Sequence, residues 1–206
     1  MKIKICGLSR EEDIDAVNTV LPDYVGFVFV PGSTRYVNYE HAQELKGKLS
    51  KKISAVGVFA DEEPEMIECM ARDGIIDLIQ LHGDEGVNDV ETLKRVCGIP
   101  IIKAISMNSY KHRESIRKFE ESSVDYLLLD SAKGGSGQMF DHRCISNIKK
   151  PFFLAGGLTS ENVGEILKDV PIVPYAVDMS SGVETNGRKD KEKICKAVRR
   201  MRDVER

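Results

Sequence analysis

The chain lacks the features that would carry it into or across a membrane. No apolar run approaches the ~18–20 residues that span a bilayer, and the first residues lack the basic, apolar and cleavage regions of a signal peptide. We therefore expect a cytoplasmic protein with no membrane partner. Linkers, low-complexity tracts and strong repeats are also missing, so the 206 residues indicate a single domain over 1–206.

The chain also has no excess of basic residues. The 30 basic and 33 acidic residues give a net charge of −3, which argues against a nucleic-acid partner. The cysteines are odd in number and form no Cys-x-x-Cys pair, so neither a zinc knuckle nor a disulfide framework is indicated. Free thiols in a reducing compartment are the simpler interpretation. The five cysteines are Cys6, Cys69, Cys97, Cys144 and Cys195.

Short apolar runs alternate with helical stretches along the whole chain. The runs are mostly continuous, which is typical of parallel strands covered on both faces. Ser9 followed by Glu12 has the spacing of a capping box and predicts the start of the first helix. We predict strands at 3–6, 24–29, 55–59, 78–81, 101–105, 126–130, 152–155 and 176–179, and helices at 11–20, 40–49, 64–72, 89–96, 112–121, 161–167 and 190–201.

Eight such units in 206 residues leave about 26 residues for each. That is close to the lower limit of ~200 residues for a (β/α)₈ barrel. We therefore predict an α/β fold, a single-domain (β/α)₈ TIM barrel. An open doubly wound sheet is the alternative.

Two predicted strands end in residues that exchange protons. Cys6 closes the first strand and Asp130 closes the sixth. Parallel α/β proteins place catalytic groups at the carboxyl ends of their strands. One candidate base and one candidate acid at such ends indicate proton-transfer chemistry.

The last two strand ends have the composition of a phosphate site. Gly156 and Gly157 follow the seventh strand, and Ser180, Ser181 and Gly182 follow the eighth. Glycines let the backbone approach an anion closely, and barrels often bind phosphate between these two loops. Plain turns would also explain either loop alone, but the two together favour a binding site.

Other strand ends carry single candidates. Arg35 lies in a turn-rich loop and could hold a carboxylate through two parallel hydrogen bonds, although a solvated loop arginine is the plain alternative. His82 has no second ligand at metal spacing, so a hydrogen-bonded structural histidine is favoured. Lys103 lies inside a strand, where pairing with a carboxylate is favoured over a Schiff-base role. The loop 131–138 is rich in glycine and serine and suits a lid.

Taken together, the strand ends resemble the phosphoribosylanthranilate isomerase family of tryptophan biosynthesis. The similarity extends over the whole chain, and its most specific parts are the start Lys4-Ile5-Cys6-Gly7 and the ending Asp178-Met179-Ser180-Ser181-Gly182-Val183-Glu184. The departure is minor: Met179 replaces a usual valine, which removes no functional group.

The resemblance implies an Amadori rearrangement in which Asp130 is the acid and Cys6 is the base. Arg35 would bind the carboxylate of the anthranilate, Gly156, Gly157, Ser180, Ser181 and Gly182 would bind the phosphate, and His82 and Asp178 would support the site. No metal or organic cofactor is expected, because the substrate's own nitrogen acts as the electron sink. The chemistry requires the pKa of Asp130 to lie above ~4 and that of Cys6 below ~8.5.

Two other interpretations remain open. A related phosphosugar barrel is one, but the histidine-pathway isomerase would have an aspartate in place of Cys6, and indole-glycerol-phosphate synthase would have an N-terminal extension. A non-catalytic phosphate-ligand sensor is the other, and it would usually have lost Cys6 or Asp130. We expect a small phosphosugar as the ligand and a monomer or homodimer as the assembly.

Overall fold

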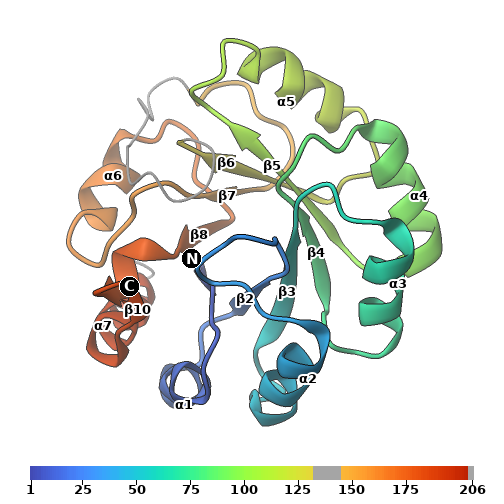
Figure 1. The fold of residues 1–206 in the computed structure, drawn as a ribbon. Helices are drawn as coiled ribbons and strands as arrows, with labels where there is room; N and C mark the ends of the chain where they lie inside the picture. Colours follow the sequence, from blue (N-terminus) through green and yellow to red (C-terminus); the bar gives the residue numbers. More distant parts are fainter. Residues whose placement is uncertain (132–144, 204–206) are drawn as a thin grey trace.

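The computed structural model describes residues 1–131 and 145–203. Its eight parallel strands follow the chain order around a closed barrel, in which β8 pairs with β1 (Figure 1). This confirms the predicted (β/α)₈ barrel and excludes the open sheet. The barrel strands are β1 (Lys2–Cys6), β2 (Tyr24–Val28), β3 (Ser54–Phe59), β4 (Leu78–Leu81), β5 (Ile101–Ser106), β6 (Tyr126–Asp130), β7 (Phe152–Leu154) and β8 (Ala176–Met179).

Helices form the outer layer of the barrel, and all seven predicted helices are present with ends shifted by a few residues at most. They are α1 (Glu11–Val20), α2 (Tyr39–Lys48), α3 (Pro64–Arg72), α4 (Val87–Cys97), α5 (His112–Glu120), α6 (Val163–Asp169) and α7 (Lys191–Asp203). The predicted lid at 131–138 lies outside the described residues except for Ser131. No helix in the described ranges is long and apolar enough to cross a membrane.

The start of α1 differs from its prediction. Arg10, not Ser9, is the N-cap. The carboxylate of Asp13 accepts hydrogen bonds from the backbone N–H groups of Ser9 (3.0 Å) and Arg10 (3.1 Å). A buried aspartate inside the first turn therefore binds the backbone N–H of Ser9, which the capping box assigned to Glu12, and that of Arg10 as well.

The connection after β8 contains structure that the sequence did not suggest. A short 3₁₀ helix, η2 (Ser181–Val183), leads into an antiparallel hairpin of β9 (Glu184–Thr185) and β10 (Arg188–Lys189). The hairpin holds two charged side chains, Glu184 and Lys189, beside the barrel. Glu184 binds Arg35, and Lys189 binds Glu184.

Alternation along each strand separates structural from functional side chains. Ile3 and Ile5 of β1 join the large apolar cluster between sheet and helices. Cys6 packs instead with Val28 and Val58 in a small separate cluster. A further interior cluster comprises Tyr24, Val56, Leu78, Ile102, Leu128, Phe153, Ala155 and Ala176. The barrel is therefore filled mainly near the amino ends of its strands, which leaves the other end for polar groups.

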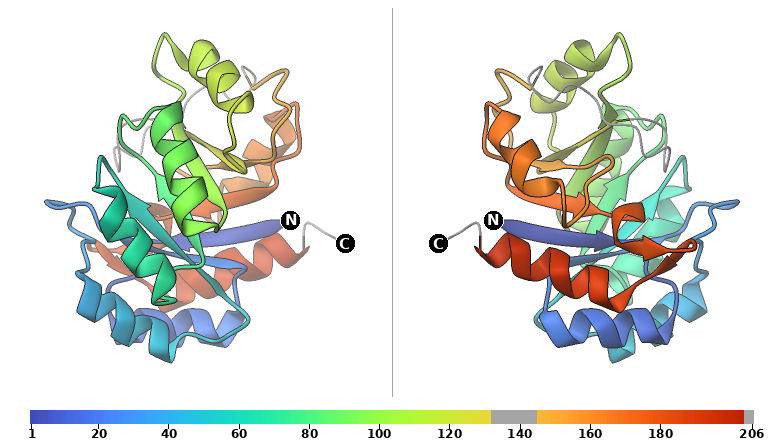
Figure 2. Two further views of the ribbon diagram at one scale, coloured as in Figure 1. Left: turned by 90° about the vertical axis from the view of Figure 1, so that its right-hand side faces the viewer. Right: turned by 90° about the vertical axis from the view of Figure 1, so that its left-hand side faces the viewer.

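The direction of the strands decides where those groups gather. In Figure 2, β1 runs from the N-terminus toward the side that carries the loop between β2 and α2. Because the strands are parallel, all eight carboxyl ends open on that side. Figure 1 looks onto this face.

Candidate active site

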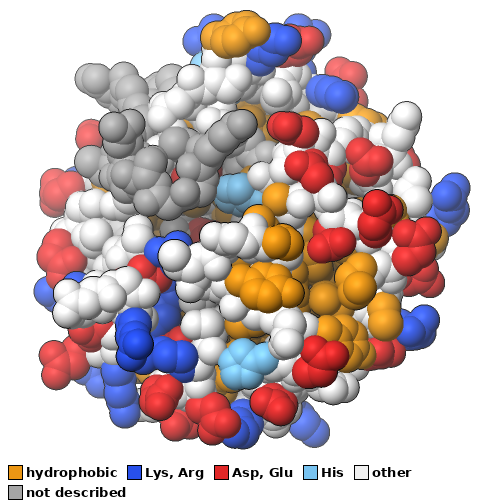
Figure 3. All heavy atoms as spheres, viewed as in Figure 1, with side chains coloured by type: hydrophobic (Ala, Val, Ile, Leu, Met, Phe, Trp, Pro, Cys, Tyr) orange, Lys and Arg blue, Asp and Glu red, His pale blue; other side chains and the backbone are white. Residues whose placement is uncertain are grey.

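A cavity of about 930 Å³ opens at the carboxyl ends of the barrel strands. In Figure 3, hydrophobic side chains gather to the right of the centre of this face, and most charged side chains lie toward the rim. All the candidate site residues from the sequence contribute to the cavity lining: Cys6, Arg35, His82, Asp130, Gly156, Gly157, Asp178, Ser180, Ser181 and Gly182. Barrel closure thus brings together residues from both ends of the chain.

Cys6 lies at the end of β1 and is almost fully buried. Gly26 of the neighbouring strand leaves the space that the thiol fills, since a Cβ at that position would lie 2.6 Å from Sγ. Burial raises the pKa of the Cys6 thiol, and the nearby Lys4 ammonium opposes the rise without cancelling it. This rise in the pKa is opposite to the shift that a thiolate in the resting protein would require.

Asp130 ends β6 beside His82, which follows β4. His82 Nε2 lies 3.6 Å from Asp130 Oδ2, and Gln80 Nε2 lies 3.0 Å from His82 Nδ1. His82 is thus hydrogen-bonded at a strand end, as predicted. Burial raises the pKa of Asp130, with His82 and the backbone N–H of Ser131 opposing the rise. Burial also lowers the pKa of His82. Both shifts favour the uncharged form of the group. For Asp130 this is the protonated form, which a carboxylic acid must have in order to donate a proton.

Lys4 and Asp178 form an ion pair on the barrel's inner surface. Lys4 Nζ lies 2.9 Å from Asp178 Oδ2, with side-chain exposures of 0% and 8%. The two residues are direct partners in the β1–β8 register. Asp178 Oδ1 is buried and has no hydrogen-bond partner among the described residues. The local pattern alone suggested no role for Lys4, although the two-residue spacing to Cys6 places both on the same face of the strand.

Arg35 is held by a carboxylate from the far end of the chain. Its Nε and Nη2 donate to the two carboxylate oxygens of Glu184, at 2.7 and 2.8 Å. Lys189 binds the same carboxylate. Burial would raise the pKa of Glu184, but the two cations outweigh it and leave the pKa below its usual value. The side chain of Arg35 is 23% exposed, so it is not the freely solvated loop arginine of the alternative interpretation.

The two glycine-containing loops lie against neighbouring elements of the site. Gly156 and Gly157 have φ values of 93° and 67°, which favour glycine. Gly182 lies against the other loop, because a Cβ there would be 1.9 Å from the carbonyl oxygen of Leu158. The Ser180 hydroxyl donates to the carbonyl of Cys6 at 3.0 Å. The loops after β7 and β8 are therefore in direct contact, and the second is tied to the end of β1.

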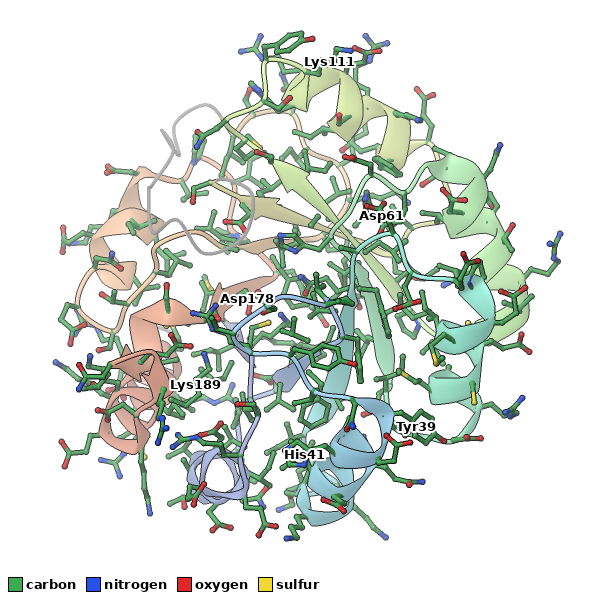
Figure 4. All side chains as sticks on the ribbon, in the orientation of Figure 1. Tyr39, His41, Asp61, Lys111, Asp178 and Lys189 are labelled. Atoms are coloured by element: carbon green, nitrogen blue, oxygen red, sulfur yellow. The ribbon has the colours of Figure 1, made fainter. Side chains whose placement is uncertain are left out.

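Lys103 pairs with a carboxylate, as favoured from the sequence. Its ammonium lies 2.6 Å from Glu85 Oε2 and donates to the carbonyl of Gly83 at 2.8 Å. Glu85 also accepts from the backbone N–H groups of Gly83 and Asp61. Asp61 is labelled in Figure 4, on the side of the barrel away from Lys189. These bonds fix the loop after His82.

The described cysteines, Cys6, Cys69, Cys97 and Cys195, are free thiols. No group of three or more His, Cys, Asp or Glu side chains within residues 1–131 and 145–203 is arranged to hold a metal ion.

Known proteins share the sequence and the fold of this chain. The family described as N-(5'phosphoribosyl)anthranilate (PRA) isomerase matches residues 3–200. The N-(5'-phosphoribosyl)anthranilate isomerase of Streptococcus mutans is 42% identical over 96% of each chain. The crystal structure of the phosphoribosyl anthranilate isomerase of Thermotoga maritima is 34% identical, covers 98% of this chain and 99% of that one, and has a TM-score of 0.87.

A further solved structure carries a ligand. It is a phosphoribosyl anthranilate isomerase in complex with reduced 1-(o-carboxyphenylamino)-1-deoxyribulose 5-phosphate, 32% identical with a TM-score of 0.85, and the alignment covers 98% of this chain and 99% of that one. Sequence and fold therefore agree over nearly the full length of each protein. The chain belongs to the N-(5'-phosphoribosyl)anthranilate isomerase family.

Proposed function

We propose that Cys6 and Asp130 are the base and the acid of the family's reaction. As a member of this family, the chain is an isomerase of tryptophan biosynthesis that acts on N-(5'-phosphoribosyl)anthranilate. The product is 1-(2-carboxyphenylamino)-1-deoxyribulose 5-phosphate. The observation that carries the assignment is the cavity itself, because the ends of β1 and β6 bring a thiol and a carboxylic acid to one pocket.

Asp130 begins the reaction by giving its proton to the ring oxygen of the ribose. The bond between that oxygen and C1 then breaks, and the nitrogen lone pair forms the protonated imine. Burial supports this role because it raises the pKa of Asp130 and so favours the protonated form at higher pH. His82 supports the acid by presenting its imidazole to Oδ2.

Cys6 completes the chemistry by taking the proton from C2 of the sugar. The electrons of the C–H bond form the C1–C2 double bond, and those of the C=N bond return to nitrogen, which gives an enolamine. Tautomerisation of the enolamine yields the ketone. The substrate nitrogen accepts the electrons throughout, so the proposed mechanism needs no cofactor.

Arg35 and Asp178 are proposed to orient the anthranilate part of the substrate. Glu184 occupies Nε and one proton of Nη2 of Arg35, and a guanidinium carries five N–H donors. Three donors therefore remain for the carboxylate of the substrate. Asp178 lines the same cavity, and its Oδ1, which has no hydrogen-bond partner among the described residues, is proposed to accept a substrate N–H or O–H.

The loops with Gly156, Gly157, Ser180, Ser181 and Gly182 are proposed to bind the phosphate. Both loops line the cavity, and backbone N–H groups in turns with left-handed glycines form concave anion sites. The ligand of the related structure carries a 5-phosphate and a carboxyphenyl group, so a site of this kind needs two anion-binding regions. Arg35 and the two loops supply one region each.

The test is a steady-state assay that follows the loss of substrate fluorescence, with the substrate generated in situ. Cys6→Ser and Asp130→Asn should each lower kcat by about 10²–10⁴-fold, the usual contribution of a general acid or base, with KM nearly unchanged. Cys195→Ser and Asp15→Asn are matched controls because neither residue lines the cavity. Wild-type turnover by Cys6→Ser or by Asp130→Asn would refute the role of that residue.

We also propose that residues 1–206 act as one catalytic domain, in the cytoplasm, as a monomer or a homodimer. The closed barrel supports the first point, since β1 and β8 pair directly. Light scattering coupled to size-exclusion chromatography decides the assembly state.

A further inference from the structure

The ion pair of Lys4 and Asp178 has a position that packing alone does not require. A buried ammonium and carboxylate are costly to desolvate, and an apolar pair is often at least as stable. The pair lies between β1 and β8, next to the thiol at the end of β1. Figure 4 shows Asp178 near the centre of the barrel face, with Lys189 farther out on the same side.

Lys4 and Cys6 share the inner face of β1, two residues apart. An ammonium has three donors, and Asp178 Oδ2 takes one of them. The thiol of Cys6 is the second group with which this ammonium interacts electrostatically. Lys4 therefore interacts both with a carboxylate and with the thiol of the proposed base.

The other charged groups near Cys6 come from two other parts of the chain. Lys189 of β10 and Arg35 of the loop after β2 both interact with the thiol electrostatically. The remaining neighbours from β2 and β3, Val28 and Val58, are apolar. Burial raises the pKa of Cys6, and Lys4 opposes this rise more strongly than any other group. Asp178 adds to the rise.

We propose that Lys4 is a positioning residue whose ammonium stabilises the thiolate of Cys6 when it forms for proton abstraction, and that Asp178 limits this effect by sharing the ammonium. The proposal rests on the proposed role of Cys6 as base. When the thiolate takes the proton from C2, the ammonium regains its full interaction with Asp178. The ammonium of Lys4 thus has an anionic partner both before and after the proton transfer.

The test measures the titration of the thiol in the unliganded protein, independently of turnover. Cys69, Cys97, Cys144 and Cys195 are first replaced by Ser, so that thiolate absorbance near 240 nm and iodoacetamide alkylation report on Cys6. Lys4→Met should raise the pKa of Cys6 by about one to three units, the usual effect of a charge within a few ångströms. Asp178→Asn should lower it.

The opposite signs separate this proposal from a structural role. Damage to packing would disturb the site in the same way in both variants, whereas removal of a cation and removal of an anion move the thiol pKa in opposite directions. Turnover by Lys4→Met in the parent protein should fall at neutral pH, because each tenfold loss of thiolate lowers the rate about tenfold, and should recover as the pH is raised. KM should change little.

Two further variants keep the test decisive. Lys4→Met/Asp178→Asn replaces the Lys4 single variant in the test if that variant does not fold, because the double variant leaves neither charge of the pair buried alone. The pKa of Cys6 in the double variant should remain above that in the parent. Lys103→Met is the matched control, since it removes another buried lysine of the barrel, one that pairs with Glu85, and should leave the thiol titration unchanged.

An unchanged thiol pKa in the Lys4 variants, or changes of the same sign in the Lys4 and Asp178 single variants, would overturn the proposal. Full turnover by Cys6→Ser would instead remove the thiol from the reaction. That second outcome leaves the titration result standing, so the two failures are distinguishable.

Discussion

A single methyl group on Gly26 should displace the thiol of Cys6 and slow the reaction. Gly26 lies beside Cys6 in the β1–β2 register, and its φ is not among the positive ones, so the backbone itself permits alanine. An added Cβ would lie 2.6 Å from Cys6 Sγ and 3.1 Å from its Cα. Non-bonded heavy atoms prefer about 3.5–4.0 Å, so the sulfur must move by about 1 Å.

The magnitude follows from that displacement. A misplacement of about 1 Å in a catalytic group costs on the order of 10²-fold in rate, so kcat of Gly26→Ala should fall by about that factor. Overpacking should also destabilise the fold by about 1–3 kcal/mol. In the Cys6→Ala background the sulfur is absent and part of that cost should disappear, which a double-mutant cycle on the free energy of unfolding measures.

The assay compares Gly26→Ala with Gly47→Ala by fluorescence turnover and by urea unfolding. Gly47 lies in α2, and a Cβ there meets nothing within 4 Å. Its replacement should leave kcat unchanged and stabilise the helix by about 1 kcal/mol. Wild-type kcat in Gly26→Ala, or a loss confined to KM, would refute the argument that this glycine reserves space for the thiol.

Other substitutions test the remaining parts of the site. Arg35→Ala should raise KM by about 10–100-fold, the worth of a charge-assisted hydrogen bond, with kcat nearly constant in steady-state assays. His82→Gln should move the limb of the pH–kcat profile governed by Asp130 to higher pH, because His82 opposes the rise in the pKa of that carboxyl. Since the pKa of Asp130 is higher in the folded protein than in the unfolded chain, folding stability falls as the pH rises above about 4. Asp130→Asn should therefore unfold at a higher temperature than the parent at pH 7, with the difference shrinking below pH 4 in calorimetry. Gly182→Ala should weaken competitive inhibition by inorganic phosphate, since a Cβ would lie 1.9 Å from the carbonyl oxygen of Leu158.

The fold was predictable because each of its units carries its own local signal. Continuous apolar runs mark the strands, and their order along the chain is also their order around the barrel. The local signals could not predict which of several nearby side chains binds a given backbone N–H group. Ser9 and Glu12 had the spacing of a capping box, but Asp13 binds the backbone N–H of Ser9 that the box assigned to Glu12. The spacing alone does not decide which side chain does so.

The lining of the cavity was predictable for a similar reason, since position at the end of a strand is a local property. The charge partners of the site residues were not. Lys4 and Asp178 are 174 residues apart and meet only because β8 pairs with β1. The pKa directions depend on such partners and on burial, so the raised pKa of Cys6 had no signal in the sequence.

Arg35 shows how a missing partner changes the chemistry expected of a residue. From the sequence alone, its guanidinium was free to bind a carboxylate through two parallel hydrogen bonds. In the folded chain one edge of that guanidinium is taken by Glu184, which Lys189 also binds. If Arg35 binds the substrate carboxylate as proposed, that carboxylate must approach the remaining donors, so Glu184 would restrict the direction of its approach. The orientation of Arg35 thus depends on the hairpin of β9 and β10, which supplies Glu184 and Lys189.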